Sequence, residues 1–174
     1  RINKMIHKIE TEKADASIAI GYGVVDATAA TTGQISSIAF PDNKEDIYLS
    51  WIGAGLGIGV VGGLTILFNH EQILLDIFEG WHYYRQYLEK NPLLKGNQIN
   101  TWNGRWISQR YDREYDSDDP LMNFNPLVPM SDGLFNLQTV PWAEVIAGIA
   151  RNNRTSNMVG YLYSIGQTNT TVGF

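Results

Sequence analysis

The chain of 174 residues contains no cysteine, and it has three histidines. The lack of cysteine excludes disulfide bonds, thiolate zinc sites and cysteine nucleophiles, and it favours a reducing compartment, so we expect a cytoplasmic protein. No Gly-x-Ser-x-Gly elbow and no metalloprotease helix motif accompanies the histidines. We therefore expect no cofactor and no metal, and the sequence leaves open whether the chain catalyses a reaction.

Charge and size are those of an ordinary folded domain. Lys and Arg number 13 against 18 Asp and Glu, which gives a net charge of −5. The length fits one domain with a buried core. The chain begins at Arg1 without a signal-peptide pattern and ends at Phe174 in a segment that reads as a strand. We therefore expect residues 1–174 to form a single domain that is a fragment or module of a larger chain or complex.

An uncharged run from Trp51 to Phe68 is one-third glycine. Its length reaches the lower limit for a membrane helix, but acidic residues flank it and no basic residue follows before Arg85. Residues 57–62 also spell the G-x-G-x-x-G of a nucleotide-binding loop, without the order of strand, turn and helix that this motif requires. Neither alternative explains the whole run.

A period of two explains the glycine run better. Glycines occupy alternate positions and apolar residues occupy the positions between them, so a strand would have one bare face and one apolar face. We therefore predict a strand over residues 47–60 with a bend at Gly62–Gly63. A bare face admits another backbone, a helix or a flat ligand at close range. The predicted close-approach face consists of Gly53, Gly55, Gly57 and Gly59.

The other patterns predict an α+β fold in which strands predominate. Residues 17–25 and 34–40 read as strands that form an antiparallel meander with residues 47–60. Residues 158–165 and 170–174 read as a C-terminal hairpin.

Two helices are predicted between these strands. Helical spacing of apolar residues predicts a long amphipathic helix over residues 70–91, with Asn69 as its N-cap. A short helix over residues 142–151 follows Pro141. The predicted apolar side of the long helix comprises Ile73, Leu74, Ile77, Phe78, Trp81, Tyr84 and Leu88.

The dipeptide Asn103–Gly104 supplies the two residues that a type I′ turn favours. A hairpin folded about this turn places Trp102 beside Arg105 and Thr101 beside Trp106. Residues 112–130 are acidic and then rich in proline, so we expect an irregular excursion there.

Two acidic patterns are incomplete as metal sites. Glu79 and His82 form the E-x-x-H of di-iron bundles, but the second pair that such a site needs is missing. Alternate acidic residues in 112–118 are spaced as calcium ligands are, but the glycine and the final glutamate of that loop are missing.

Basic and aromatic residues are interleaved between Gly80 and Tyr111. Basic groups neutralise phosphates, and aromatic planes stack on unpaired bases. The sequence therefore favours a non-catalytic binding module whose helix–hairpin surface (80–111) binds single-stranded nucleic acid or another polyanion. Other protein chains, or the remainder of a longer polypeptide, are the expected partners. The candidate ligand-binding residues are Arg85, Lys95, Trp102, Asn103, Arg105, Trp106 and Arg110.

Three other readings of the same residues stay open at this point. The aromatic residues can be core and amphipathic cover, with the basic residues paired to the acidic run that follows. The chain can be an enzyme on a small polar or sugar-like substrate, with tryptophans that stack on it and acid–base groups among Asp76, Glu79 and Asp116. It can also be a subunit anchored in a membrane through residues 51–68, which the flanking charges disfavour.

Overall fold

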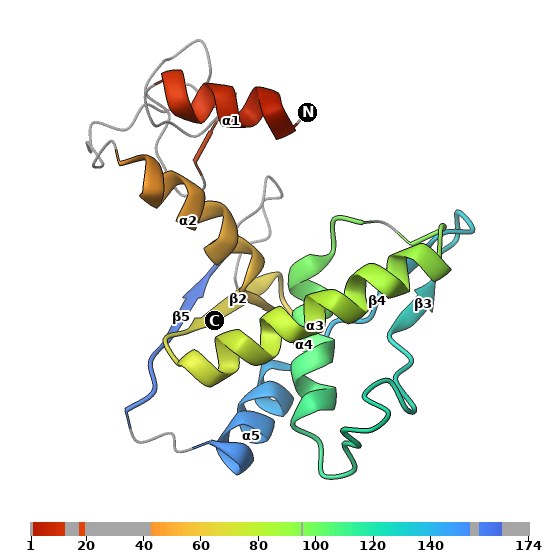
Figure 1. Cartoon of the computed structure of the whole chain (residues 1–174). Coiled ribbons are helices and arrows are strands. Elements are labelled where there is room, and N and C mark those ends of the chain that lie inside the picture. The colour runs from red at the N-terminus through yellow and green to blue at the C-terminus, as the bar shows by residue number, and fades with distance from the viewer. Residues whose placement is uncertain (1, 13–17, 20–42, 95, 154–156, 165–174) are drawn as a thin grey trace. The chain divides into compact units, whose positions relative to one another are not determined.

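The computed structural model describes residues 2–12, 18–19, 43–94, 96–153 and 157–164 (Figure 1). The chain divides into two compact units, Arg1–Gly55 and Leu56–Phe174, which we describe separately. Helices and small antiparallel sheets make up the described residues, which confirms the predicted α+β class. Helices cover more of the described chain than strands do, so the prediction that strands predominate is wrong.

The described part of the first unit contains two helices, α1 (Ile2–Thr11) and α2 (Lys44–Gly55). Lys44 Nζ lies 2.7 Å from Glu10 Oε2, and this hydrogen bond is the main reason why the pKa of Glu10 is lowered. The buried core of the unit consists of Ile9, Ile18, Ala19 and Ile47.

Helix α2 occupies most of the segment that was predicted as a strand over residues 47–60. Asn43 Oδ1 accepts a hydrogen bond from the backbone N–H of Glu45 at 3.1 Å, which caps the start of the helix. Two acidic residues in its first turn further favour a helical N-terminus. A strand begins only at Ile58, so the predicted strand is correct from there to Val60 and wrong before it.

The second unit is built on a three-stranded antiparallel sheet with the order β1–β2–β5. Its strands are β1 (Ile58–Val60), β2 (Leu64–Phe68) and β5 (Gly160–Tyr163). Gly62 and Gly63 have φ angles of 96° and 73° in the turn between β1 and β2. Glycine adopts this left-handed backbone without strain, so the predicted bend is a tight hairpin turn.

Three helices accompany this sheet. They are α3 (Glu71–Lys90), α4 (Ile99–Arg110) and α5 (Trp142–Asn152). Figure 1 shows α3 lying across α4, and α4 also packs against β1 and α5. Helices α3 and α5 confirm the two predicted helices, although His70 rather than Asn69 is the N-cap of α3.

The remaining elements differ from the prediction in part. Strand β3 (Leu127–Pro129) pairs with β4 (Phe135–Leu137), so the segment 112–130 is not irregular throughout. Strand β5 corresponds to the first strand of the predicted C-terminal hairpin. Its second strand, residues 170–174, lies outside the described residues.

The first two strands of the predicted meander cannot be compared in full with the structure. Ile18 and Ala19 are the described part of the segment 17–25, and they lie in a turn. The rest of that segment and residues 34–40 lie outside the described residues.

Helix α4 spans the segment where a type I′ hairpin was predicted, so that prediction is wrong. Trp102 and Trp106 lie four residues apart, and both are fully buried. Burial of a large apolar side chain contributes about 1.5–3 kcal/mol, whereas a glycine inside a helix costs only about 1 kcal/mol. The two buried indoles therefore outweigh the local turn preference of Asn103–Gly104.

Gly104 is required for the close approach of α4 to β1. A Cβ atom at Gly104 would collide with the carbonyl oxygen of Gly59, and a Cβ at Gly59 would lie 2.8 Å from the carbonyl carbon of Asn100. The glycines of the two elements therefore allow one backbone to lie directly on the other.

We expect Gly104→Ala to lower the free energy of unfolding by about 1–3 kcal/mol through overpacking. The same substitution normally stabilises a helix by about 1 kcal/mol, so the sign of the change is diagnostic. Gly96→Ala is the matched control, because nothing lies within 4 Å of its Cβ position, and we expect a change within about 0.5 kcal/mol. Urea unfolding measures both variants. Stabilisation by Gly104→Ala would contradict the close approach.

Candidate functional site

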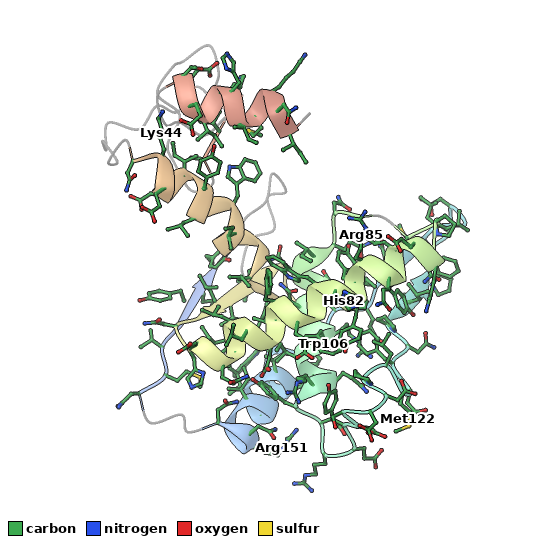
Figure 2. All side chains as sticks on the ribbon, viewed as in Figure 1. Lys44, His82, Arg85, Trp106, Met122 and Arg151 are labelled. Carbon is green, nitrogen blue, oxygen red and sulfur yellow. The ribbon has the colours of Figure 1, made fainter. Side chains whose placement is uncertain are left out.

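The two tryptophans of the predicted nucleic-acid surface lie at the crossing of α3 and α4 rather than on the surface. Trp102 Nε1 donates a hydrogen bond to the Gly80 carbonyl at 2.8 Å, and Trp106 Nε1 donates to the Asp76 carbonyl at 2.7 Å. The two donors are four residues apart on α4, and the two acceptors are four residues apart on α3. One face of α4 therefore bonds to one face of α3. Figure 2 shows Trp106 at this crossing. Both indole N–H groups therefore form their hydrogen bonds inside the fold.

Other rings of the core surround these indoles. The ring of Tyr83 stacks on that of Trp106 with 4.8 Å between centroids, and the ring of Tyr84 lies 5.0 Å from that of Trp102. Phe124 contacts Trp102 edge-on at 5.2 Å. Aromatic contacts of this kind add about 0.5–1.5 kcal/mol each beyond area burial. A base can reach these tryptophans only after the core opens.

Asn103 is also buried, and its amide holds α4 against the start of β1. Its Nδ2 donates to the Gly57 carbonyl at 2.8 Å, while its Oδ1 accepts a hydrogen bond from Trp81 Nε1 at 3.1 Å. Asn100 Nδ2 donates to the same Gly57 carbonyl at 2.9 Å. The structure therefore places Asn103 in an internal network rather than in a position to read base edges.

The basic candidates are dispersed among different environments. Arg85 is exposed, and its Nε lies 3.1 Å from Glu89 Oε1. Arg110 is half-buried, with its Nη2 at 3.6 Å from Asp76 Oδ1 and its guanidinium 4.7 Å above the ring of Tyr115. An exposed pair such as Arg85–Glu89 contributes about 0.3–0.5 kcal/mol and dissociates readily.

Two further basic candidates remain. Among the residues that the structure describes, the buried Nε of Arg105 has no hydrogen-bond partner, and no ion pair there involves Arg105. Lys95 lies outside the described residues. The structure therefore does not bring the predicted site residues together on one exposed surface.

The four glycines of the predicted close-approach face belong to two different units. Gly53 and Gly55 lie in α2, and nothing lies within 4 Å of a Cβ placed at Gly53. Gly57 and Gly59 meet other parts of the protein: a Cβ at Gly57 would lie 2.6 Å from the hydroxyl of Tyr163. The prediction of a single bare glycine face is wrong, because the chain is helical up to Gly55. Close approach holds at Gly57 and Gly59, where protein atoms fill the space.

A buried carboxylate at Asp76 joins α3 to the end of α4. Tyr111 Oη donates a hydrogen bond to Asp76 Oδ2 at 2.6 Å, and Gln72 Nε2 donates to Oδ1 at 3.1 Å. Burial, followed by the hydrogen bond to Asp76, raises the pKa of Tyr111 well above its ordinary value. With Arg110 near the other oxygen, the carboxylate is enclosed by partners of its own chain. This arrangement joins the two helices and offers no open acceptor to a substrate.

Of the other residues of the enzyme alternative, Glu79 shares the Arg110 guanidinium with Asp76, and Asp116 lies in a local turn. Glu79 is half-exposed and lies 4.0 Å from Arg110 Nε. Asp116 Oδ1 accepts a hydrogen bond from the backbone N–H of Asp118 at 2.8 Å, as in a local turn. The stacking tryptophans of that alternative are the buried ones of the α3–α4 crossing.

The described part of the chain bears on the metal and membrane hypotheses. No group of three histidine, aspartate or glutamate side chains there is placed to hold a metal ion. No helix among those residues combines the length and the apolar character that a membrane span requires.

The outer side of α3 carries two exposed apolar side chains, Leu75 and Phe78. Phe78 is 61% exposed and Leu75 is 54% exposed, although the opposite side of the helix is buried. The ring of half-buried Trp81 lies 5.2 Å from that of Phe78 and widens the apolar area. Figure 2 shows His82 and Arg85 further along the same helix. We call the exposed residues along this side the α3 outer strip, which consists of Glu71, Leu75, Phe78, His82, Arg85 and Glu89.

Sequence reasoning missed this strip because it placed Phe78 on the buried side. A narrower arc is buried, and it comprises Ile73, Asp76, Ile77, Gly80 and Tyr84. Gly80 was the sequence feature that could have shown which side of the helix is buried. A Cβ at Gly80 would collide with the indole of Trp106, so this glycine marks the centre of the buried arc and leaves Phe78 outside it.

A second exposed apolar area lies on β5. Tyr161 and Leu162 are exposed on this strand, which pairs with β2 on one side. The residues that follow, 165–174, lie outside the described chain. The α3 outer strip is therefore the better-defined candidate surface.

No known protein family, no curated protein and no solved structure matches this chain at a significant level.

We expect Tyr111→Phe to lower the free energy of unfolding by about 1–3 kcal/mol, because a buried carboxylate loses its shortest hydrogen bond. Tyr161→Phe is the matched control, since Tyr161 is 57% exposed, and we expect a change within about 0.5 kcal/mol. Equal unfolding midpoints for the two variants in urea would contradict the structural role of the Asp76–Tyr111 pair.

The same pair predicts a dependence of stability on alkaline pH. Folding raises the pKa of Tyr111, so the folded state holds the phenol proton more tightly than the unfolded chain does. The resulting stability is present below the unfolded pKa of about 10 and is lost as pH rises through the folded pKa. We expect the loss of stability above about pH 10 to be smaller in Tyr111→Phe than in the original chain. Equal losses of stability above about pH 10 in both proteins would contradict this contribution of Tyr111.

Proposed function

We propose that this chain is a non-catalytic binding module whose α3 outer strip contacts another protein chain. The observation that carries the proposal is the exposure of Phe78 and Leu75 on the strip. These residues lie three positions apart, so they are neighbours on the helix surface.

The arrangement of side chains on the strip supports a protein partner. A helix that inserts into a groove uses apolar anchors at spacings of three, four and seven residues. Leu75 and Phe78 are apolar residues at the spacing of three, and Trp81 adds an aromatic edge. His82 follows four positions after Phe78 as a polar neighbour. Aromatic anchors carry a large share of the binding free energy in protein interfaces. The charged residues toward the two ends of the strip, Glu71 on one side and Arg85 and Glu89 on the other, provide the polar rim that such interfaces have.

A protein partner suits this surface better than single-stranded nucleic acid. Base stacking needs exposed rings, and Trp102 and Trp106 are fully buried. The outer strip has Glu71 and Glu89 beside Arg85, so its charge is mixed rather than basic. Binding of nucleic acid stays a prediction, for which Arg105 is a basic candidate whose Nε has no hydrogen-bond partner among the described residues.

Photo-crosslinking from single positions tests the proposal. We expect a photoreactive phenylalanine analogue at position 78 to give a discrete covalent adduct in cells of the natural host, because Phe78 is at the centre of the proposed contact. The same analogue at position 93 is the matched control, since Leu93 is also half-exposed and lies outside the strip. Adding Leu75→Glu should abolish the adduct from position 78.

The chemistry of the adduct decides between the partners. An adduct that protease digests and nuclease leaves intact supports the proposal. An adduct that nuclease removes would favour nucleic acid, and equal adducts from positions 78 and 93 would contradict a specific surface.

A further inference from the structure

We propose that the partner of the α3 outer strip is a second copy of this chain, with the two α3 helices antiparallel. This inference rests on the proposed function and names the partner of the same surface. It is carried by the spacing of the strip and by the order of its charges.

The strip has the spacing of a two-helix contact. Its six residues are separated by four, three, four, three and four positions, the spacing that coiled-coil seams also have, but only Leu75 and Phe78 are apolar as coiled-coil seam residues are. The apolar residues Leu75 and Phe78 lie inside the seam, and charged or polar residues lie on both sides of them. A seam with this alternation remains on one side of a helix over several turns.

Charge selects one arrangement of the two copies. A two-fold axis midway between Leu75 and Phe78 places each Leu75 against Phe78 of the second copy. The same axis places each Glu71 carboxylate against the His82 imidazole of the second copy, which can donate a hydrogen bond to it. Both contacts occur twice by symmetry, as an isologous interface requires.

The alternative arrangements bring like charges together. A parallel pair would place Glu71 against Glu71 and Arg85 against Arg85. An antiparallel pair with its axis between Phe78 and His82 would place Glu71 against Glu89, and Leu75 against a charged arginine. Like charges opposite each other on paired helices are unfavourable. Of these three arrangements, the axis between Leu75 and Phe78 pairs the two apolar residues with each other and brings no like charges together.

The flanking residues agree with such a pair. Leu74 and Trp81 border the strip on one side, and both are half-buried, so each has apolar surface left to cover. Gln72 and Glu79 border it on the other side. The paired segment, residues 71–82, is about 18 Å long at 1.5 Å per residue. A contact this short lies at the low end of interface sizes, so we expect a weak dimer.

Sedimentation of the purified full chain from low micromolar to near-millimolar concentration tests the pairing. We expect a monomer–dimer equilibrium that Leu75→Glu weakens at least about tenfold, which corresponds to about 1.4 kcal/mol. Leu93→Glu is the matched control and should leave the equilibrium unchanged, because Leu93 is exposed to a similar degree outside the strip. Circular dichroism confirms that both variants fold.

Single cysteines test the register, since the chain has none of its own. A mixture of Leu75→Cys and Phe78→Cys proteins should oxidise mainly to the mixed disulfide dimer rather than to the two like pairs. Charge exchange gives an independent test: Glu71→Lys should weaken the dimer, and adding His82→Glu should restore it.

The outcomes separate this inference from the proposed function. A chain that stays monomeric at every concentration, or a dimer that Leu75→Glu leaves unchanged, overturns the second copy as partner. A predominance of like-pair disulfides overturns the antiparallel register. If the chain is monomeric and position 78 still crosslinks to a different protein, the proposed function stands and this inference fails. If position 78 gives no specific adduct and the chain is monomeric, both fail.

Discussion

The close contact of α4 with both β1 and α3 determines the arrangement of the second unit. On one side, Gly104 lies against the carbonyl of Gly59, so no side chain separates the helix from the strand. On the other side, the indole N–H groups of Trp102 and Trp106 bond to carbonyls of α3. The glycine contact fixes the distance of α4 from β1, because a larger side chain there would collide with the strand. The indole hydrogen bonds fix the rotation of α4, because a rotated helix would lose them.

This contact also decides which side of α3 faces outward. The two acceptor carbonyls belong to Asp76 and Gly80, and the Asp76 side chain is held by Tyr111. The buried arc of α3 is therefore centred on these residues, and the opposite side carries Leu75 and Phe78. The exposed apolar strip therefore follows from the rotation of α3 that the core imposes. Binding to a partner would bury them without any change in the fold.

Local signals were sufficient for part of this structure. The spacing of apolar residues predicted α3, and Pro141 marked the start of α5, because each helix buries one side and has a clear boundary residue. The α+β fold class was predictable for the same reason. The turn between β1 and β2 was visible in Gly62 and Gly63, whose backbone conformation favours glycine.

Tertiary contacts decided the parts that sequence patterns misread. Asn103–Gly104 has the composition of a turn, but both residues serve the packing of α4 on β1, which a single sequence does not reveal. Trp102 and Trp106 suit a stacking surface as well as a core, and only the carbonyls of α3 distinguish the two. The same ambiguity affected Phe78, because a helix with many apolar residues does not show which of them its neighbours can cover.

Hydrogen exchange of the indole N–H groups, followed by nuclear magnetic resonance, tests this account most directly. The indole protons of Trp102 and Trp106 should exchange only through opening of the core and so be protected by a large part of the unfolding free energy. The indole of Trp142, which is 59% exposed, should exchange rapidly in the same sample. Exchange of Trp102 and Trp106 at the rate of Trp142 would contradict the locked crossing of α3 and α4, and with it the assignment of the outer strip.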